Sequence, residues 1–122
     1  MNKKEVERLA EIYLERTINL LGESKYHPHT PYLVIETTPE SEGIDNEWHG
    51  EYVPEDNEII IYAKNITSKS DLAKTIVHEY AHYLQDPKWM TRYYSMGYSY
   101  NNHPYEREAF KTEELNWYKV CK

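Results

Sequence analysis

One helical segment constrains the fold of this 122-residue chain more than any other feature. Residues 68–86 read SKSDLAKTIVHEYAHYLQD; a serine near the start can cap a helix, and Pro87 marks its end. Within the predicted helix, His78 and His82 are four residues apart, which places them on one face, one turn apart. This face is either a solvated surface or a site that uses both imidazoles.

The rest of the pattern predicts an α+β fold with an N-terminal helix, a small mostly antiparallel sheet and a C-terminal helix. Apolar spacing predicts the first helix over residues 4–21, stopped by Gly22. A strand is expected at 32–37, and WHGEYVPEDNEIIIYAKN predicts two more strands joined by a turn at PEDN. Pro104 can open the last helix. Residues 1–122 are expected to form a single domain, because no repeat or linker interrupts this order.

Composition argues against several partners. The formal net charge of -7 disfavours nucleic acid and anionic membranes, which both need clustered Lys and Arg. No stretch has the apolar length that spans a bilayer, and the charged N-terminus lacks the apolar region of a secretory peptide. The single cysteine, Cys121, fits a reducing compartment. We therefore expect a cytoplasmic protein with no nucleic-acid and no membrane partner, packed in part through its 13 tyrosines.

The HEYAH sequence predicts a metal site with hydrolytic chemistry. His78 and His82 can aim their imidazoles at one point, and neutral imidazole is a good zinc ligand. Glu79 points to the side of the two-histidine axis, where it can reach a zinc-bound water but not the metal. Zinc lowers the pKa of that water to about 7, and a carboxylate beside it can take the proton and deliver it to a leaving amine. We interpret Glu79 as the general base of metal-assisted peptide hydrolysis.

The third protein ligand that a catalytic zinc usually takes must come from elsewhere in the chain. Glu106 and Glu108 lie near the start of the predicted last helix, and a helix running back would bring Glu106 beside the HEYAH face. Its position in the first turn suits a carboxylate. His103 is a third candidate, although its place before Pro104 favours a helix-start role.

HEYAH, the EREA sequence at 106–109 and the preceding strands together resemble the gluzincin zinc peptidases, whose third ligand is a glutamate on a later helix. By its small size the chain is most similar to the soluble minigluzincins, a resemblance that covers roughly residues 50–115. Those proteins look like the catalytic core of membrane-embedded peptidases without the membrane helices.

The resemblance implies one Zn²⁺ per chain, held by His78, His82 and Glu106, with Glu79 as general base. It implies that an extended peptide or protein substrate aligns on the strand near 58–63 as a sheet edge. The known minigluzincins are regarded as latent or self-inhibited, so weak activity as isolated, as in a zymogen, is expected. Exposed tyrosines and an exposed edge strand favour a homodimer.

One departure from the family affects the third ligand. Many relatives carry an aspartate four residues after the glutamate ligand, where it orients a zinc histidine; here that position is Phe110. Either another group orients the histidine, or Glu108 is the ligand. We favour Glu106.

Two other functions stay open on the sequence alone. One is a regulatory peptidase-like module that cleaves one specific protein partner; the other is a non-catalytic zinc-binding domain, which the lone cysteine supports poorly. The aromatic connection at 87–103 can line a substrate cleft or cover the core. We expect Trp48 and His49 to be packing and surface residues, and Arg107 to pair with a carboxylate.

Overall fold

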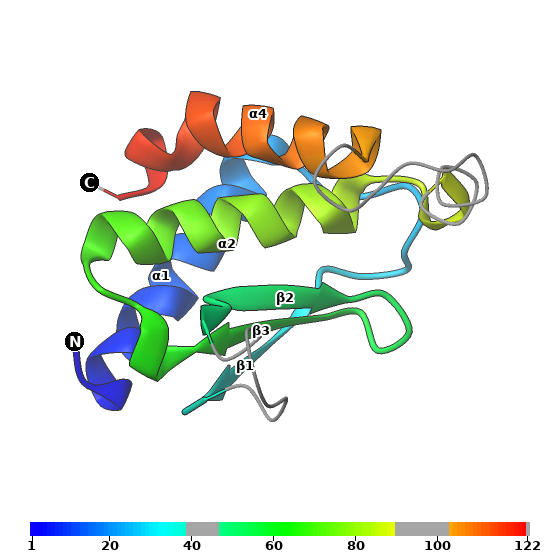
Figure 1. Cartoon of the computed structure of the whole chain (residues 1–122). Helices are drawn as coiled ribbons and strands as arrows, with labels where there is room; N and C mark the ends of the chain where they lie inside the picture. The colour runs from blue at the N-terminus through cyan, green and yellow to red at the C-terminus, as the bar shows by residue number, and fades with distance from the viewer. Residues whose placement is uncertain (39–46, 90–102, 122) are drawn as a thin grey trace.

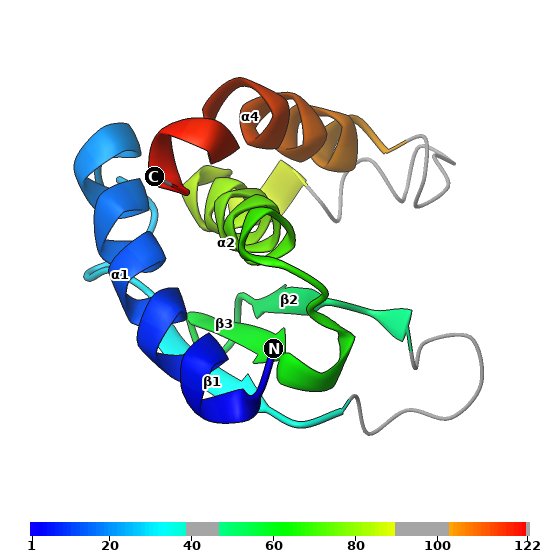
Figure 2. The same cartoon turned by 90° about the vertical axis from the view of Figure 1, so that its left-hand side faces the viewer.

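The computed structural model describes residues 1–38, 47–89 and 103–121 as an α+β fold arranged around one central helix, α2 (Figure 1). Helix α2 lies between the sheet and helix α4, and α1 runs alongside α2 and the sheet (Figure 2). The predicted α+β class and the order of elements are confirmed. The elements are α1 (Lys3–Leu21), β1 (Tyr32–Glu36), β2 (Gly50–Val53), β3 (Glu58–Tyr62), the 3-10 turn η2 (Ala63–Asn65), α2 (Lys69–Leu84) and α4 (Pro104–Val120).

The sheet is mixed and has the order β1-β3-β2. β1 pairs with β3 in parallel, and β2 pairs with β3 as the antiparallel hairpin that was predicted around the PEDN turn. Because β1 lies on the side of β3 away from β2, the strand near 58–63 is central, and the expectation that it is an edge is wrong. Its Ile59 and Ile61 are fully buried, as suits a central strand. The edge beside α2 and α4 is β2.

Each helix boundary has a local cause. Helix α1 stops at Gly22, as predicted, where φ is 80° and the backbone N–H donates to the Ile18 carbonyl. Ser68 begins α2, because its Oγ accepts from the Asp71 N–H at 3.1 Å. His103 is the N-cap of α4, where its Nδ1 accepts from the Tyr105 N–H at 3.1 Å, which agrees with a helix-start role.

The hydrophobic core fills the space between α1, α2 and the sheet. Tyrosines take part in it: Tyr80 and Tyr83 are fully buried, and their hydroxyls donate to the backbone carbonyls of Gly22 and His29. Among the described residues, no helix is long and apolar enough to cross a membrane. The α2 side chains in the core are Leu72, Ala73, Ile76, Val77, Tyr80 and Tyr83, which leaves the His78–His82 face for the opposite side.

Candidate metal centre

A cleft of about 470 Å³ opens between β2, α2 and α4, and the two histidines of HEYAH line it. Strand β2 can approach α2 closely because residue 50 is glycine. A Cβ there would lie 2.8 Å from both the Ile60 carbonyl oxygen and Thr75 Cγ2. The lining comprises residues 48–52, then Asp71, Lys74, Thr75, His78, Glu79 and His82 of α2, and Glu106, Phe110 and Glu113 of α4.

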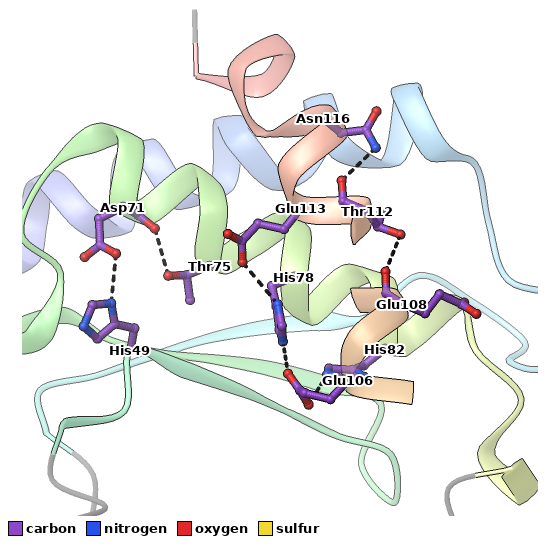
Figure 3. A network of polar contacts seen from close by, with 10 residues as sticks. All are labelled: His49, Asp71, Thr75, His78, His82, Glu106, Glu108, Thr112, Glu113 and Asn116. Atoms are coloured by element: carbon purple, nitrogen blue, oxygen red, sulfur yellow. Dashed lines mark hydrogen bonds and ion pairs between the residues drawn. The ribbon is translucent and has the colours of Figure 1, made fainter. Parts of the chain in front are cut away.

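His78, His82 and Glu106 meet in this cleft (Figure 3). Each offers one ligand atom, and these atoms lie within 4.8 Å of one another. The His82 Nε2 is 3.1 Å from one carboxylate oxygen of Glu106, and the His78 Nε2 contacts the other. All three side chains are buried. Helix α4 runs back along α2 in the opposite direction, so its first turn comes beside HEYAH.

The outward-facing nitrogen of each imidazole also has a partner. The His78 Nδ1 is 3.2 Å from a Glu113 oxygen, and the His82 Nδ1 is 2.8 Å from Gln85 Oε1. The Gln85 amide is oriented by its other end, because Nε2 donates to the Tyr105 carbonyl at 2.8 Å. Carboxylate and amide oxygens only accept, so each Nδ1 carries the proton and donates it.

Each Nε2 also lies against an oxygen of the ionised Glu106, which only accepts, so without a metal both imidazoles carry a proton there as well. A metal ion would displace the two Nε2 protons, and the Nε2 lone pairs of the neutral imidazoles would then face it. Two imidazole nitrogens and one carboxylate therefore converge on one small region. This donor set suits zinc, with ligands of the types that its sites use. The residues present thus fit a bound metal ion.

The charges in the cluster act strongly on one another. Burial lowers the pKa of His78, but its contacts with Glu106 and Glu113 outweigh burial and raise the pKa to about 10. Burial raises the pKa of Glu106, whereas hydrogen bonds to the two histidines dominate and hold that pKa well below its usual range. The cluster therefore strongly favours an ionised Glu106.

Glu79 lines the same cleft but has a different environment. Its side chain is buried, with 9% of the residue exposed, and burial raises its pKa against the opposing effect of His82 and His78. Within the described ranges it forms no hydrogen bond or ion pair. Among the described residues no fully buried side-chain oxygen lacks a hydrogen-bond partner, so the Glu79 oxygens face the open space of the cleft. Carboxyl groups with a raised pKa in a cleft concentrate at functional sites.

The other candidates for the third ligand lie apart from the cluster. The Glu108 side chain is exposed, and its contact is with Gln85 Nε2 at 3.4 Å. His103 caps α4, as described above, and Arg107 is exposed. Of the aromatic connection, Trp89 is described and is 47% exposed, whereas Tyr93, Tyr94, Tyr98 and Tyr100 lie outside the described residues.

Two residues that were expected only to pack or face solvent line the cleft instead. Trp48 is 44% exposed, and the His49 Nδ1 lies 2.9 Å from Asp71 Oδ1. The cause is the position of β2: because it is the edge strand, the residues that lead into it border the open side of α2.

Sequence reasoning also missed Glu113 and Gln85. Glu113 is seven residues after Glu106, two helical turns on the same face, and Gln85 is three residues after His82. These two helical spacings place both residues beside the predicted ligands, and they could have identified both from the sequence.

Comparison of the chain with protein-family models, curated proteins and solved structures gives no match. A function is therefore inferred from the residues of the chain and their geometry.

Proposed function

We propose that this chain is a zinc-dependent metallopeptidase of the gluzincin type, with one Zn²⁺ held by His78, His82 and Glu106. The observation that carries the proposal is the convergence of these three ligand atoms in an open cleft that the carboxylate of Glu79 also lines. Three protein ligands are the usual number for a catalytic zinc, whereas structural zinc sites are usually closed by four.

A zinc ion held by these residues would act as a Lewis acid that polarises the scissile carbonyl and makes a water molecule more acidic. Glu79 takes a proton from the attacking water as the water oxygen bonds to the carbonyl carbon. When the carbon–nitrogen bond breaks, Glu79 delivers that proton to the leaving amine. Gln85 holds the His82 imidazole throughout, because its amide oxygen accepts the Nδ1 hydrogen bond.

We further propose that β2, at the edge of the sheet, aligns the substrate. The Tyr62 N–H donates to the His49 carbonyl at 2.9 Å, so these two residues form a hydrogen-bonded pair. Pairing alternates along an antiparallel ladder, so Gly50 and Tyr52 turn their backbone polar groups away from β3. An extended peptide can add to this edge by main-chain hydrogen bonds. The same residues line the cleft that contains Glu79.

Replacing the Glu79 carboxylate by an amide tests the assignment of Glu79 as the general base. Glu79→Gln keeps the size of the side chain but removes the base, so the zinc-loaded variant should hold as much zinc as the unaltered chain and hydrolyse no peptide. Quenched fluorescent peptides and an unfolded protein serve as substrates, and mass spectrometry measures the zinc. Hydrolysis that survives in Glu79→Gln contradicts the assignment.

The regulatory module that cleaves one protein shares this site and differs in substrate. Cleavage of a single partner, with no turnover of unfolded protein, would favour it in the same assay. Binding of zinc with no cleavage of any substrate would favour a non-catalytic domain. Weak activity of the isolated protein and formation of a homodimer remain predictions. Light scattering across concentrations tests whether the homodimer forms.

A further inference from the structure

The position on α4 where the gluzincin peptidases that the chain resembles carry an orienting aspartate is occupied by an aromatic ring. Phe110 packs edge-on against the His78 imidazole, with ring centroids 4.6 Å apart and an interplanar angle of 66°. A phenyl ring can contact the imidazole but offers no oxygen to accept a hydrogen bond from Nδ1. Whatever fixes the tautomer of His78 must therefore come from another residue.

Glu113 reaches that nitrogen from the next turn of α4. It lies seven residues after Glu106, on the same face, and its Oε1 is 3.2 Å from the His78 Nδ1 (Figure 3). Side chains on a helix lean toward its N-terminus, which for α4 is the end that carries Glu106. A glutamate is therefore long enough, and leans in the right direction, to replace a shorter acid one turn earlier.

We propose that Glu113 is the positioning residue that holds His78 in its metal-binding orientation and tautomer. This inference rests on the proposed zinc site. By accepting the Nδ1 hydrogen, the Glu113 carboxylate directs the Nε2 lone pair toward the ion and makes the imidazole a stronger donor. His82 is held by the neutral amide of Gln85 instead. Of these two outer partners, only Glu113 is charged, so its loss should weaken the metal site.

Zinc affinity and the ligand field measure this role without any assay of activity. Glu113→Ala should bind zinc about 10–100-fold more weakly, as is typical when an outer partner of a zinc histidine is lost. Glu113→Gln should lose less, because its amide oxygen can still accept the Nδ1 hydrogen bond. The matched control is Glu114→Ala, which removes an exposed carboxylate from the adjacent position on α4. Competition with a coloured chelator gives the affinities.

Two further readouts separate positioning from a structural role. The visible spectrum of the Co²⁺-loaded chain should change in Glu113→Ala and not in Glu114→Ala, because that spectrum reports the ligand geometry. In the metal-free chain, Glu113→Ala leaves the buried His78 Nδ1–H without its acceptor and should melt several degrees lower, whereas Glu114→Ala should lose no stability. Glu113→Gln keeps an acceptor and should melt close to the unaltered chain, so its zinc affinity and Co²⁺ spectrum report positioning apart from stability.

A rescue variant returns the carboxylate to the earlier turn. Glu113→Ala lowers the logarithm of the zinc affinity, and adding Phe110→Asp should recover at least half of that decrease. Adding Phe110→Ala to Glu113→Ala should not. If Glu113→Ala matches Glu114→Ala in zinc affinity and Co²⁺ spectrum, the inference is overturned and the zinc site stands. If the unaltered chain binds no zinc, both the inference and the proposed function fall.

Discussion

Glu106, in the first turn of α4, lies against the Nε2 atoms of His78 and His82, with the His82 contact at 3.1 Å. The carboxylate and the first histidine are 28 residues apart in the sequence. They meet because α4 runs back along α2, and the two helices pack closely. The candidate metal centre is thus a property of the helix pair and not of the HEYAH sequence alone.

The choice between Glu106 and Glu108 gives a matched pair of variants. Glu106→Ala should lose zinc, because it removes the carboxylate that faces both histidines. Glu108→Ala should keep about one zinc per chain, because its side chain is exposed and lies outside the cluster. Zinc content after gel filtration distinguishes them. The opposite result would make Glu108 the third ligand.

Zinc should stabilise the folded chain, because the three ligands are brought together only by folding. At a free zinc concentration of 100 times the dissociation constant, the gain should be about 2.7 kcal/mol. Thermal unfolding with zinc and with a chelator measures it, and His82→Ala serves as the control. An equal zinc-dependent shift in His82→Ala would place the ion elsewhere.

Gln85→Ala should weaken both the fold and the site. It leaves the His82 Nδ1 hydrogen and the Tyr105 carbonyl without their partner in a buried region, which costs about 1–3 kcal/mol. Zinc affinity should also fall about 10–100-fold. Urea unfolding of the metal-free chain and chelator competition measure the two effects separately. Unchanged values in both would show that Gln85 is dispensable.

Gly50→Ala should destabilise the chain by about 1–3 kcal/mol, the usual effect of adding a group to a filled space. The new Cβ would lie 2.8 Å from the Ile60 carbonyl and from Thr75 Cγ2. Adding Thr75→Ser should restore part of the loss, because it removes the Cγ2 and keeps the hydroxyl that donates to the Asp71 carbonyl. Urea unfolding checks both variants, and a neutral Gly50→Ala would contradict close packing of β2 on α2.

Local patterns predicted most of the elements, because their causes are local. The helical spacing of 68–86, the stop at Gly22 and the start at Pro104 depend on neighbouring residues. The sheet order depends instead on the long-range pairing of β1 with β3. Nothing within EIIIY indicates which of its two sides is free, so the wrong strand was expected at the edge.

The candidate site also combines residues that local spacing predicts with residues that depend on how distant helices pack. His78, Glu79 and His82 are defined by helical spacing, so the sequence identified them directly. The meeting of α2 with α4 then favours Glu106 over Glu108. Glu113 was missed because only the position four residues after Glu106 was considered, although a long side chain two turns away reaches the same imidazole.

The metal centre is tested most directly by the mass of the intact folded chain in native mass spectrometry, measured after adding zinc and removing the excess. One zinc ion per chain is expected, and none in His82→Ala under the same conditions. A chain that takes up no zinc, or a His82→Ala variant that keeps it, would contradict the assignment of His78, His82 and Glu106 as the metal centre.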